Sequence, residues 1–361
     1  MQANWIQKAN SPASPCGLRR GKPVSLCGLR FGRPASIRLS RSRPPFRFCP
    51  LLFLVLICGC SRQAVSDRPG AEHLFARVEI IGTRGTGMGQ FTKPRSLALD
   101  REDNLYVIDM TGRVQKFSPS GEVLFSWRMP ETDLGKPKGM CCDSEGHIVI
   151  VEPHYQRVNH FASDGTLVAQ WGHRGTNIGE LTLPRSVAVN SRGDLFVTEY
   201  TTVDRVQSFS AKEHKPLLCL GRPGTGDGEF NRAEGVAIGS DDRVYVADSC
   251  NHRVEIFSSD GHFLSVCGKP GRGPGELSYP YDVKVDASGR LFVCEFGNSR
   301  IQIFDARQQS IEMLGGPGNL PGQLNNPWAI ALDSRGNLYV ADAGNHRVVK
   351  FVRKAGAGSK A

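Results

Sequence analysis

The sequence predicts an all-β fold, a six-bladed β-propeller whose last blade is closed by the N-terminal strand. Three observations lead to this prediction: a unit that recurs six times, four short strands in each complete unit, and one unpaired strand before the first unit. Four-stranded units that repeat every 40–50 residues, roughly, are typical of propeller blades arranged around a ring.

The repeated unit contains a Pro, a short apolar strand, an acidic turn with Gly or Asn, the pattern Leu-Tyr-Val-x-Asp and the pattern Arg-Val-x-x-Phe. The units begin at Pro94, Pro137, Pro184, Ala233, Pro280 and Pro327. Their arginines follow one another at 44 to 48 residues and are Arg113, Arg157, Arg205, Arg253, Arg300 and Arg347. In the first unit, alternating β-branched and aromatic residues between turn residues predict strands at 96–100, 104–109, 113–118 and 122–127.

The number of strands predicts how the ring closes. The sixth unit offers only three strands, at 327–333, 337–342 and 347–352. An unpaired strand at 76–82 precedes the first unit and matches the strands that lead into other units, such as 168–172. We therefore expect residues 76–82 to complete the last blade, which removes the exposed edges of an open sheet.

The two clearest copies of the unit are Val244-Tyr-Val-Ala-Asp248-Ser-Cys-Asn-His-Arg253-Val and Asn337-Leu-Tyr-Val-Ala-Asp342-Ala-Gly-Asn-His-Arg347-Val. They resemble NHL repeats, a family named after such a motif, and the resemblance covers residues 76–353. The second unit diverges most, because it lacks the Gly-rich loop that precedes other units. The resemblance implies a binding function, since NHL propellers mostly bind proteins or RNA.

The basic charge of the chain is confined to its first part. Residues 1–59 contain ten basic residues and no acidic residue, whereas basic and acidic residues are equal in number from Cys60 onward. The formal net charge of +10 therefore gives no support for a nucleic-acid partner, and none is predicted. An apolar run at 51–58 is too short to span a bilayer and is typical of a signal peptide.

This apolar run ends in Leu56-Ile57-Cys58-Gly59-Cys60, which resembles the lipobox of bacterial lipoproteins. The resemblance implies cleavage before Cys60 and lipidation of its thiol. We predict a leader at 1–59, a tether at 60–75, the propeller at 76–353 and a flexible C-terminal tail at 354–361. The protein would then be a membrane-anchored lipoprotein on the periplasmic or cell-surface side.

Features that occur in every unit are interpreted as scaffold. Each unit has one acid four to six residues before its arginine: Asp109, Glu152, Glu199, Asp248, Glu295 and Asp342. One carboxylate pair could indicate acid–base catalysis, but six equivalents favour a repeated ion pair or loop anchor. The Gly-rich loops also recur, so their glycines are expected to provide positive φ angles rather than a phosphate site.

No metal or cofactor is predicted. The six cysteines after Cys60 show no CxxC pair and are interpreted as small buried hydrophobic residues: Cys141, Cys142, Cys219, Cys250, Cys267 and Cys294. His252 and His346 stand in the repeated Asn-His-Arg motif. A lyase branch of the family uses a central metal with histidine ligands, but these positions are expected to be peripheral. The acidic turns at 143–146 and 333–336 lack the ligand pattern of an EF-hand.

Two sets of positions vary between units and provide the candidate ligand-binding residues. The first set follows the opening residue of each unit and consists of Arg95, Lys138, Arg185, Glu234, Tyr281 and Trp328. The second set follows each repeated acid and consists of Met110, Pro153, Tyr200, Ser249, Phe296 and Ala343, of which Tyr200 and Phe296 are candidates. Both sets are expected to ring one mouth of the central channel. Arg and Lys suit anionic groups, and aromatic rings stack on sugars or apolar side chains. The alternative is a solvated rim with packed aromatics.

These observations favour a non-catalytic, lipid-anchored binding module outside the cytoplasm. Its expected partner is a protein, a peptide or an envelope glycan. Two alternatives stay open: a metal-dependent propeller enzyme, either a lyase or a lactonase-like hydrolase, and a structural scaffold of an envelope assembly.

The substitution Cys60→Ala is expected to leave an unprocessed or soluble precursor, because the acyl chains supply the membrane affinity. Membrane fractionation and mass spectrometry of the mature N-terminus measure this outcome. Cys58→Ala is the matched control and is expected to keep the lipid. A mature wild-type protein without lipid at Cys60 would contradict the lipobox interpretation.

Overall fold

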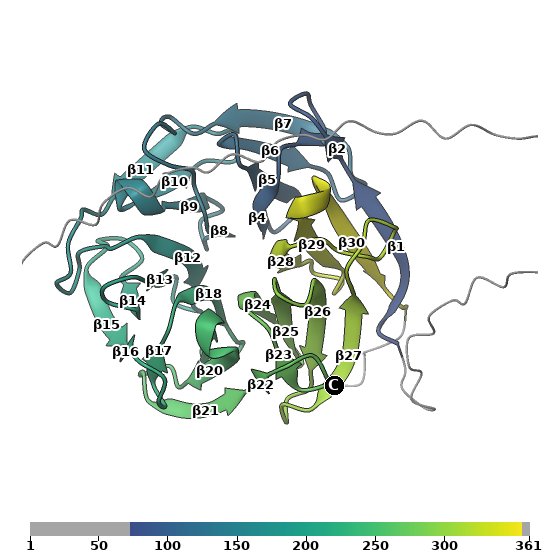
Figure 1. The fold of residues 1–361 in the computed structure, drawn as a ribbon. Helices are drawn as coiled ribbons and strands as arrows, with labels where there is room; N and C mark the ends of the chain where they lie inside the picture. Colours follow the sequence, from purple (N-terminus) through teal and green to yellow (C-terminus); the bar gives the residue numbers. More distant parts are fainter. Residues whose placement is uncertain (1–72, 356–361) are drawn as a thin grey trace, which may run out of the picture. The chain divides into compact units, whose positions relative to one another are not determined.

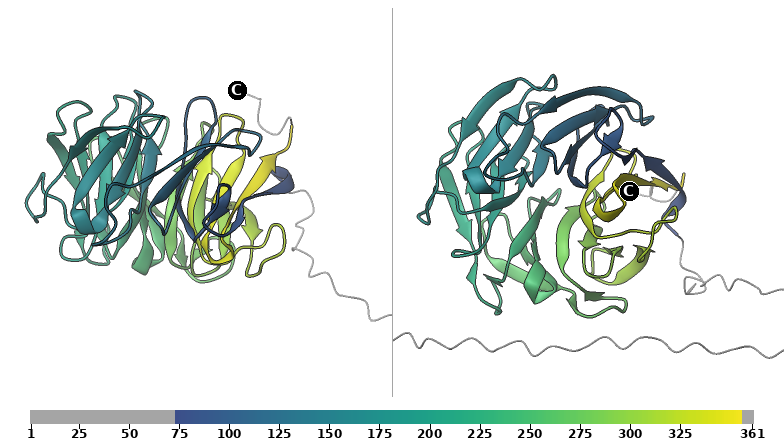
Figure 2. Two further views of the ribbon diagram at one scale, coloured as in Figure 1. Left: turned by 90° about the horizontal axis from the view of Figure 1, so that it is seen from above. Right: turned by 45° about the horizontal axis from the view of Figure 1, so that its top comes forward.

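The computed structural model describes residues 73–355, which form six four-stranded antiparallel sheets around a central axis (Figure 1). Figure 2 shows the same ring from two further directions, with the strands running between its two faces. The prediction of an all-β, six-bladed propeller is confirmed. The predicted leader, Cys60 and most of the predicted tether lie outside the described residues. Within residues 73–355 there is no helix with the length and apolar character needed to cross a membrane.

The first five blades follow one another in chain order. Blade 1 contains β4 (Pro94–Leu99), β5 (Leu105–Asp109), β6 (Arg113–Phe117) and β7 (Val123–Arg128). Blade 2 contains β8 (Met140–Cys142), β9 (Ile148–Glu152), β10 (Arg157–Phe161) and β11 (Leu167–Trp171). Blade 3 contains β12 (Pro184–Val189), β13 (Leu195–Glu199), β14 (Arg205–Phe209) and β15 (Pro216–Leu220). Blade 4 contains β18 (Ala233–Ile238), β19 (Val244–Asp248), β20 (Arg253–Phe257) and β21 (Phe263–Cys267). Blade 5 contains β24 (Pro280–Val285), β25 (Leu291–Glu295), β26 (Arg300–Phe304) and β27 (Ser310–Gly315).

Blade 6 joins the two ends of the described chain. It contains β28 (Pro327–Leu332), β29 (Leu338–Asp342), β30 (Arg347–Arg353) and β1 (Phe75–Ile81). β1 pairs antiparallel with β30, so that Val78 lies opposite Phe351 and Ile81 opposite Val348. The predicted closure is therefore confirmed, with the strand one residue earlier than predicted.

Six hydrophobic clusters fill the six interfaces between neighbouring blades. In the cluster between blades 5 and 6, for example, Phe292 shares one core with Ile330 and Val349. Because each sheet has a neighbour on both faces, the second strands do not alternate between buried and exposed residues. All five residues of β5 and of β29 are buried.

Short connecting elements complete the fold. The Gly-rich loops form parallel two-residue pairs: β2 (Thr83–Arg84) with β3 (Gln90–Phe91), β16 (Arg222–Pro223) with β17 (Glu229–Phe230), and β22 (Lys269–Pro270) with β23 (Glu276–Leu277). Three 3-10 helices link second and third strands: η1 (Pro153–Tyr155), η2 (Ser249–Asn251) and η3 (Ala343–Asn345). Gly82 has a φ of 78°, and a Cβ there would lie 2.3 Å from the Phe91 ring, so this position requires glycine.

The repeated acid and arginine hold the Gly-rich loop in place. In blade 4, Arg253 Nε donates to Asp248 Oδ2 at 2.8 Å, and Arg253 Nη2 donates to the carbonyls of Gly226 and Glu229 at 2.6 and 2.7 Å. Buried Asp248 also accepts the backbone N–H of Asn231 at 2.7 Å. Equivalent contacts to loop carbonyls are made by Arg113, Arg205, Arg300 and Arg347. The predicted loop anchor is therefore confirmed.

A second side chain that contacts the loop before each blade is different in blade 4 from its equivalents in blades 1, 3 and 5. At the centre of the third strand, blades 1, 3 and 5 carry a glutamine that donates to a loop carbonyl and accepts a glycine N–H: Gln115, Gln207 and Gln302. Glu255 occupies this register position in blade 4. Burial raises the pKa of Glu255 to about 7, although Arg253 lies 2.7 Å away. Only the protonated carboxyl can donate to the loop as the glutamine amide does.

The substitution Glu255→Gln is expected to stabilise the fold above pH 7 and to change little at pH 4. The folded-state pKa of Glu255 lies above its ordinary value of 4.5, so the wild type loses stability as pH rises through this window to about 7. The loss is on the order of 2 kcal/mol in the free energy of unfolding. Thermal melting from pH 4 to pH 9 measures it, with Gln302→Glu as the control expected to add the same pH dependence. Equal effects of Glu255→Gln at pH 4 and pH 8 would contradict this assignment.

Deletion of residues 75–81 is expected to lower the melting temperature by several degrees and to promote aggregation, because β30 becomes an open edge. Deletion of residues 356–361, which removes no strand of a blade, serves as the control. Differential scanning fluorimetry and light scattering compare the two deletions. If the protein without residues 75–81 were as stable and as soluble as the wild type, the pairing of β1 with β30 would not stabilise the ring.

Candidate functional site

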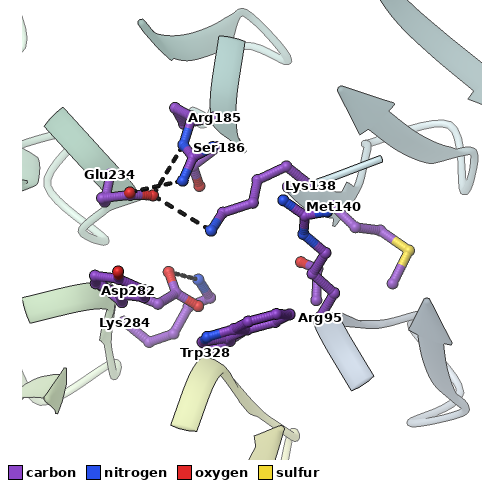
Figure 3. A pocket seen from close by; sticks show the side chains of 13 residues that line it. Arg95, Lys138, Met140, Arg185, Ser186, Glu234, Asp282, Lys284 and Trp328 are labelled. Atoms are coloured by element: carbon purple, nitrogen blue, oxygen red, sulfur yellow. Dashed lines mark hydrogen bonds and ion pairs between the residues drawn. The ribbon is translucent and has the colours of Figure 1, made fainter. Parts of the chain in front are cut away.

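Six side chains, one from each blade, meet in the central channel. Figure 3 labels all of them except Tyr281. Each follows the residue that opens the innermost part of its blade, and together they are Arg95, Lys138, Arg185, Glu234, Tyr281 and Trp328. Equivalent positions of six blades necessarily lie at a similar height around the axis. The expected convergence of this set is therefore observed.

An ion pair between blades 3 and 4 forms one side of the channel. Arg185 Nε and Nη2 donate to the two carboxylate oxygens of Glu234 at 3.0 and 2.7 Å. Both side chains are buried, with exposed fractions of 8% for Arg185 and 1% for Glu234. Burial disfavours the ionised form of Glu234, but Lys138, Arg185 and the nearby Arg232 together lower its pKa to about 2. This carboxylate is therefore ionised at neutral pH and is a weak base.

Lys138 reaches across the channel. Its Nζ lies 3.5 Å from Glu234 Oε2, and 5.2 and 5.6 Å from the ring centroids of Tyr281 and Trp328. The side chain is only 11% exposed. Burial lowers the pKa of Lys138 to about 7; Glu234 opposes this shift, while Arg185 adds to it. Lys138 consequently changes its protonation state near neutral pH.

Arg95 has no carboxylate partner among residues 73–355. Its guanidinium lies 5.5 Å from the Trp328 ring centroid, and its Nη1 donates to Met110 Sδ at 3.3 Å. Its Nε is buried without a hydrogen-bond partner. Burial and the charge of Arg185 lower the pKa of Arg95 to about 10, so the group is still a cation at neutral pH. Arg95 therefore combines a positive charge with unused hydrogen-bonding capacity.

The second predicted ring contacts the first ring within individual blades. Arg185 lies 4.6 Å above the Tyr200 ring centroid in blade 3. Phe296 stacks on Tyr281 in blade 5, with ring centroids 4.5 Å apart and an interplanar angle of 12°. These contacts place Tyr200 and Phe296 beside the channel residues on one face, as expected.

Three further charged residues at the channel were not identified from the sequence: Arg232, Asp282 and Lys284. Arg232 Nε donates to Glu234 at 2.7 Å, and Lys284 Nζ donates to Asp282 Oδ1 at 3.0 Å. The comparison of the six units could have identified Asp282 and Lys284, because both are charged where the other units are not. The positions equivalent to Asp282 in the other units are occupied by Ser, Gly or Ala, and those equivalent to Lys284 by Ala or Cys.

The channel contains more positive than negative groups. Its cations are Arg95, Lys138, Arg185, Arg232 and Lys284, and its two carboxylates are Glu234 and Asp282. The free space between the lining side chains is about 20 Å³. This volume holds roughly one water molecule, so the side chains themselves fill the channel.

One alternative for this face is wrong. The alternative of a solvated rim does not hold for Arg185 and Glu234, which are buried because they pair with each other across neighbouring blades. The basic and the aromatic residues of the first set are also in contact across the channel. Lys138 is long enough to cross the narrow channel and lie over Tyr281 and Trp328.

The remaining candidate groups are structural. His252 and His346 end 3-10 helices with positive φ, and their Nδ1 atoms accept the backbone N–H groups of Tyr279 and Lys93 in the next blade at 3.0 and 3.2 Å. All six described cysteines are free. The prediction of buried cysteines holds only for Cys267 and Cys294. Cys141, Cys142 and Cys250 are half-buried, and Cys219 is exposed because it lies on the outermost strand of blade 3.

Comparison by sequence identifies the repeats. The NHL repeat model matches residues 230–257, 277–304 and 324–351, which are the centres of blades 4, 5 and 6. The chain is 48% identical over 50 residues to the lin-41 protein of Caenorhabditis elegans, covering 14% of this chain and 4% of that protein. It is 24% identical over 135 residues to the brain tumor protein of Drosophila melanogaster, covering 37% of this chain and 12% of that protein. The chain therefore spans a small part of either relative.

Solved structures share the ring at low sequence identity. They include a catalytically inactive virginiamycin B lyase from Staphylococcus aureus with quinupristin (TM-score 0.53, 14% identity, 75% of this chain and 82% of that chain). They also include a gluconolactonase from Xanthomonas campestris (TM-score 0.56, 15% identity, 73% of this chain and 87% of that chain). A third is an auxiliary nutrient binding protein from Bacteroides ovatus (TM-score 0.59, 13% identity, 78% of this chain and 78% of that chain). At such identities the likeness shows the fold alone. This chain is therefore a six-bladed β-propeller that contains NHL repeats, matched at the centres of blades 4, 5 and 6.

Proposed function

We propose that this protein is a non-catalytic binding module, held outside the cytoplasm by a lipid on Cys60. Its channel face would recognise a carboxylate-bearing group of a protein, a peptide or an envelope glycan. The observation that carries the proposal is the excess of positive charge around Arg95 and Lys138, on the face where the variable residues converge.

An anionic ligand would supply the negative charge and the hydrogen-bond acceptors that the channel lacks. Arg95 Nε has no hydrogen-bond partner, and Lys138 shares Glu234 with Arg185 and Arg232. Hydrogen bonds from ionised donors to a carboxylate are among the strongest that a protein makes. The narrow free space limits entry to a small terminal group, which would displace a water molecule while the rest of the ligand lies on the face outside.

The aromatic side chains favour a ligand with a flat or apolar part next to its charge. Trp328 and Tyr281 lie directly beside the two cations, and both are partly exposed. Aromatic rings in this arrangement contact sugar rings and apolar side chains over a large area. A uronic acid and a glutamate-containing peptide both combine these two chemical properties.

The alternative of a metal-dependent enzyme has less support. The described residues that line the channel include no histidine and no cysteine, and both carboxylates there are paired with cations. The likeness to the lyase and the gluconolactonase extends to the fold only. The Bacteroides ovatus protein, described as nutrient binding, indicates that a similar ring is compatible with a binding function.

The substitution Arg95→Met is expected to weaken binding of an acidic probe about tenfold or more, because one charge-assisted hydrogen bond is lost. The same change should leave the melting temperature equal or higher, since it removes an unpaired buried charge. Arg185→Met is the matched control and should lower the melting temperature, because it leaves Glu234 without its main partner. Calorimetric titration with galacturonate and hexaglutamate, beside galactose and hexaglutamine, measures binding.

Binding should also depend on pH through Lys138. Its pKa of about 7 means that the ammonium form dominates at pH 6 and the neutral amine at pH 8.5, so affinity for the acidic probe should fall over this range. Lys138→Gln is expected to remove most of this dependence. If neither acidic probe binds better than its neutral counterpart at pH 6, the proposed recognition of anions at this face is wrong.

A further inference from the structure

A second polar cluster lies in blade 2, outside the channel. It consists of Asp143 and His147 in the turn between β8 and β9, and His160 on β10. Asp143 Oδ2 lies 3.2 Å from His147 Nδ1 and 3.4 Å from His160 Nδ1. One ligand atom from each residue lies within 4.8 Å of the other two. Nothing in the proposed channel function uses these three side chains.

The turn itself is part of the repeated scaffold. Asp143 Oδ1 accepts the backbone N–H groups of Glu145 and His147 at 2.9 and 2.8 Å. The corresponding acids of other blades anchor their turns in the same way, and they are Asp100, Asp286 and Asp333. Oδ1 of Asp143 therefore has a structural role, which leaves Oδ2 for a different one.

The surroundings of Oδ2 are what distinguishes blade 2. In blade 6 the equivalent oxygen of Asp333 accepts from the Asn337 amide at 2.7 Å and from the Tyr339 hydroxyl at 3.2 Å. His147 stands at the position of Asn337, and the smaller Val149 stands at that of Tyr339. His160 occupies the position that is lysine in blades 1 and 6. Two imidazoles therefore replace an amide, a phenol and an ammonium group.

We propose that Asp143, His147 and His160 form a zinc site whose fourth position is open to the adjoining groove. Zinc–nitrogen and zinc–oxygen bonds of about 2.0–2.1 Å place tetrahedral ligands about 3.3–3.4 Å apart. The two printed separations from Asp143 Oδ2 are 3.2 and 3.4 Å, close to that value. Two imidazoles with one carboxylate suit Zn²⁺ better than Ca²⁺ or Mg²⁺, which prefer oxygen ligands.

Access and burial agree with such a site. His160 is buried, whereas the His147 side chain is 27% exposed, so the cluster has one inner and one outer side. A groove of about 310 Å³ between blades 2 and 3 is lined by both histidines and by His214. The Glu145 carboxylate lies 3.8 Å from His147 Nδ1 on the exposed side. The fourth position can therefore be taken by this carboxylate or by water from the groove.

Trp171 makes the site observable. Its indole N–H donates to His160 Nε2 at 3.1 Å, so without metal His160 carries its proton on Nδ1 and donates it to Asp143. A metal on Nδ1 moves this proton to Nε2, where it faces the indole N–H. The indole must then give up its hydrogen bond. Trp171 also stacks on His214, with ring centroids 4.7 Å apart, so its movement changes the lining of the groove.

The test is titration of the metal-free full chain with zinc chloride, followed by calorimetry and by tryptophan fluorescence. One zinc per chain is expected, with a fluorescence change on binding. His147→Asn and His160→Lys should each weaken zinc binding at least about tenfold. Both variants should fold, because Asn337 and Lys350 stand at these positions in blade 6; their melting temperatures verify this. His262→Asn removes an exposed histidine of blade 4 and should bind zinc like the wild type.

A fourth variant tests the tautomer argument. Trp171→Phe should bind zinc at least as tightly as the wild type, because no indole N–H opposes the metal-bound form of His160, and it should lose the fluorescence change. The proposal is overturned if the wild type binds no zinc, or if folded His147→Asn and His160→Lys bind it like the wild type. Weaker zinc binding by Trp171→Phe would overturn Nδ1 coordination by His160. These outcomes are independent of anion binding in the channel.

Discussion

The buried ion pair between each repeated acid and its arginine is the interaction on which the channel depends. The arginine holds the carbonyls of the preceding loop, and the acid accepts a backbone N–H at the end of that loop, as Asp248 does from Asn231. Asn231 lies three residues before Glu234, and the equivalent N–H in blade 5, from Ser278, lies three residues before Tyr281. In five blades, a contact that looks purely structural therefore sets the backbone from which the channel side chain projects; in blade 2, Glu152 accepts only from the side chains of Arg157 and Asn159.

The sequence was sufficient for the ring, its closure and the set of channel residues, because all three follow from comparing six copies in register. It was not sufficient for the contacts among those residues. The pairing of Arg185 with Glu234 depends on a distance across two blades that no pattern encodes. The zinc candidate was missed for a different reason. Asp143 was considered only as part of a turn that lacks the ligand pattern of an EF-hand, and its partners His147 and His160 belong to one blade only.

The two candidate sites show how a repeat protein can vary without losing its fold. Substitutions in the channel change side chains that face the axis, where six blades converge. Substitutions in blade 2 change the second oxygen of an acid whose first oxygen still anchors the turn. In both cases, the backbone contacts are retained while side-chain chemistry changes. The channel retains unpaired positive charge, which is expected to reduce stability at a site used for binding.

The exchange of β1 into blade 6 also determines when the native ring can form. β1 pairs with β30, whose residues follow it by more than 260 positions in the chain, so this contact has a large loop-closure entropy. During synthesis from the N-terminus, Phe75–Ile81 has no partner until the final blade exists, and the earlier blades stand as an open arc with two uncovered ends. Ring closure therefore cannot precede synthesis of the final blade, and until then the unpaired edge of β1 is available for pairing with another chain.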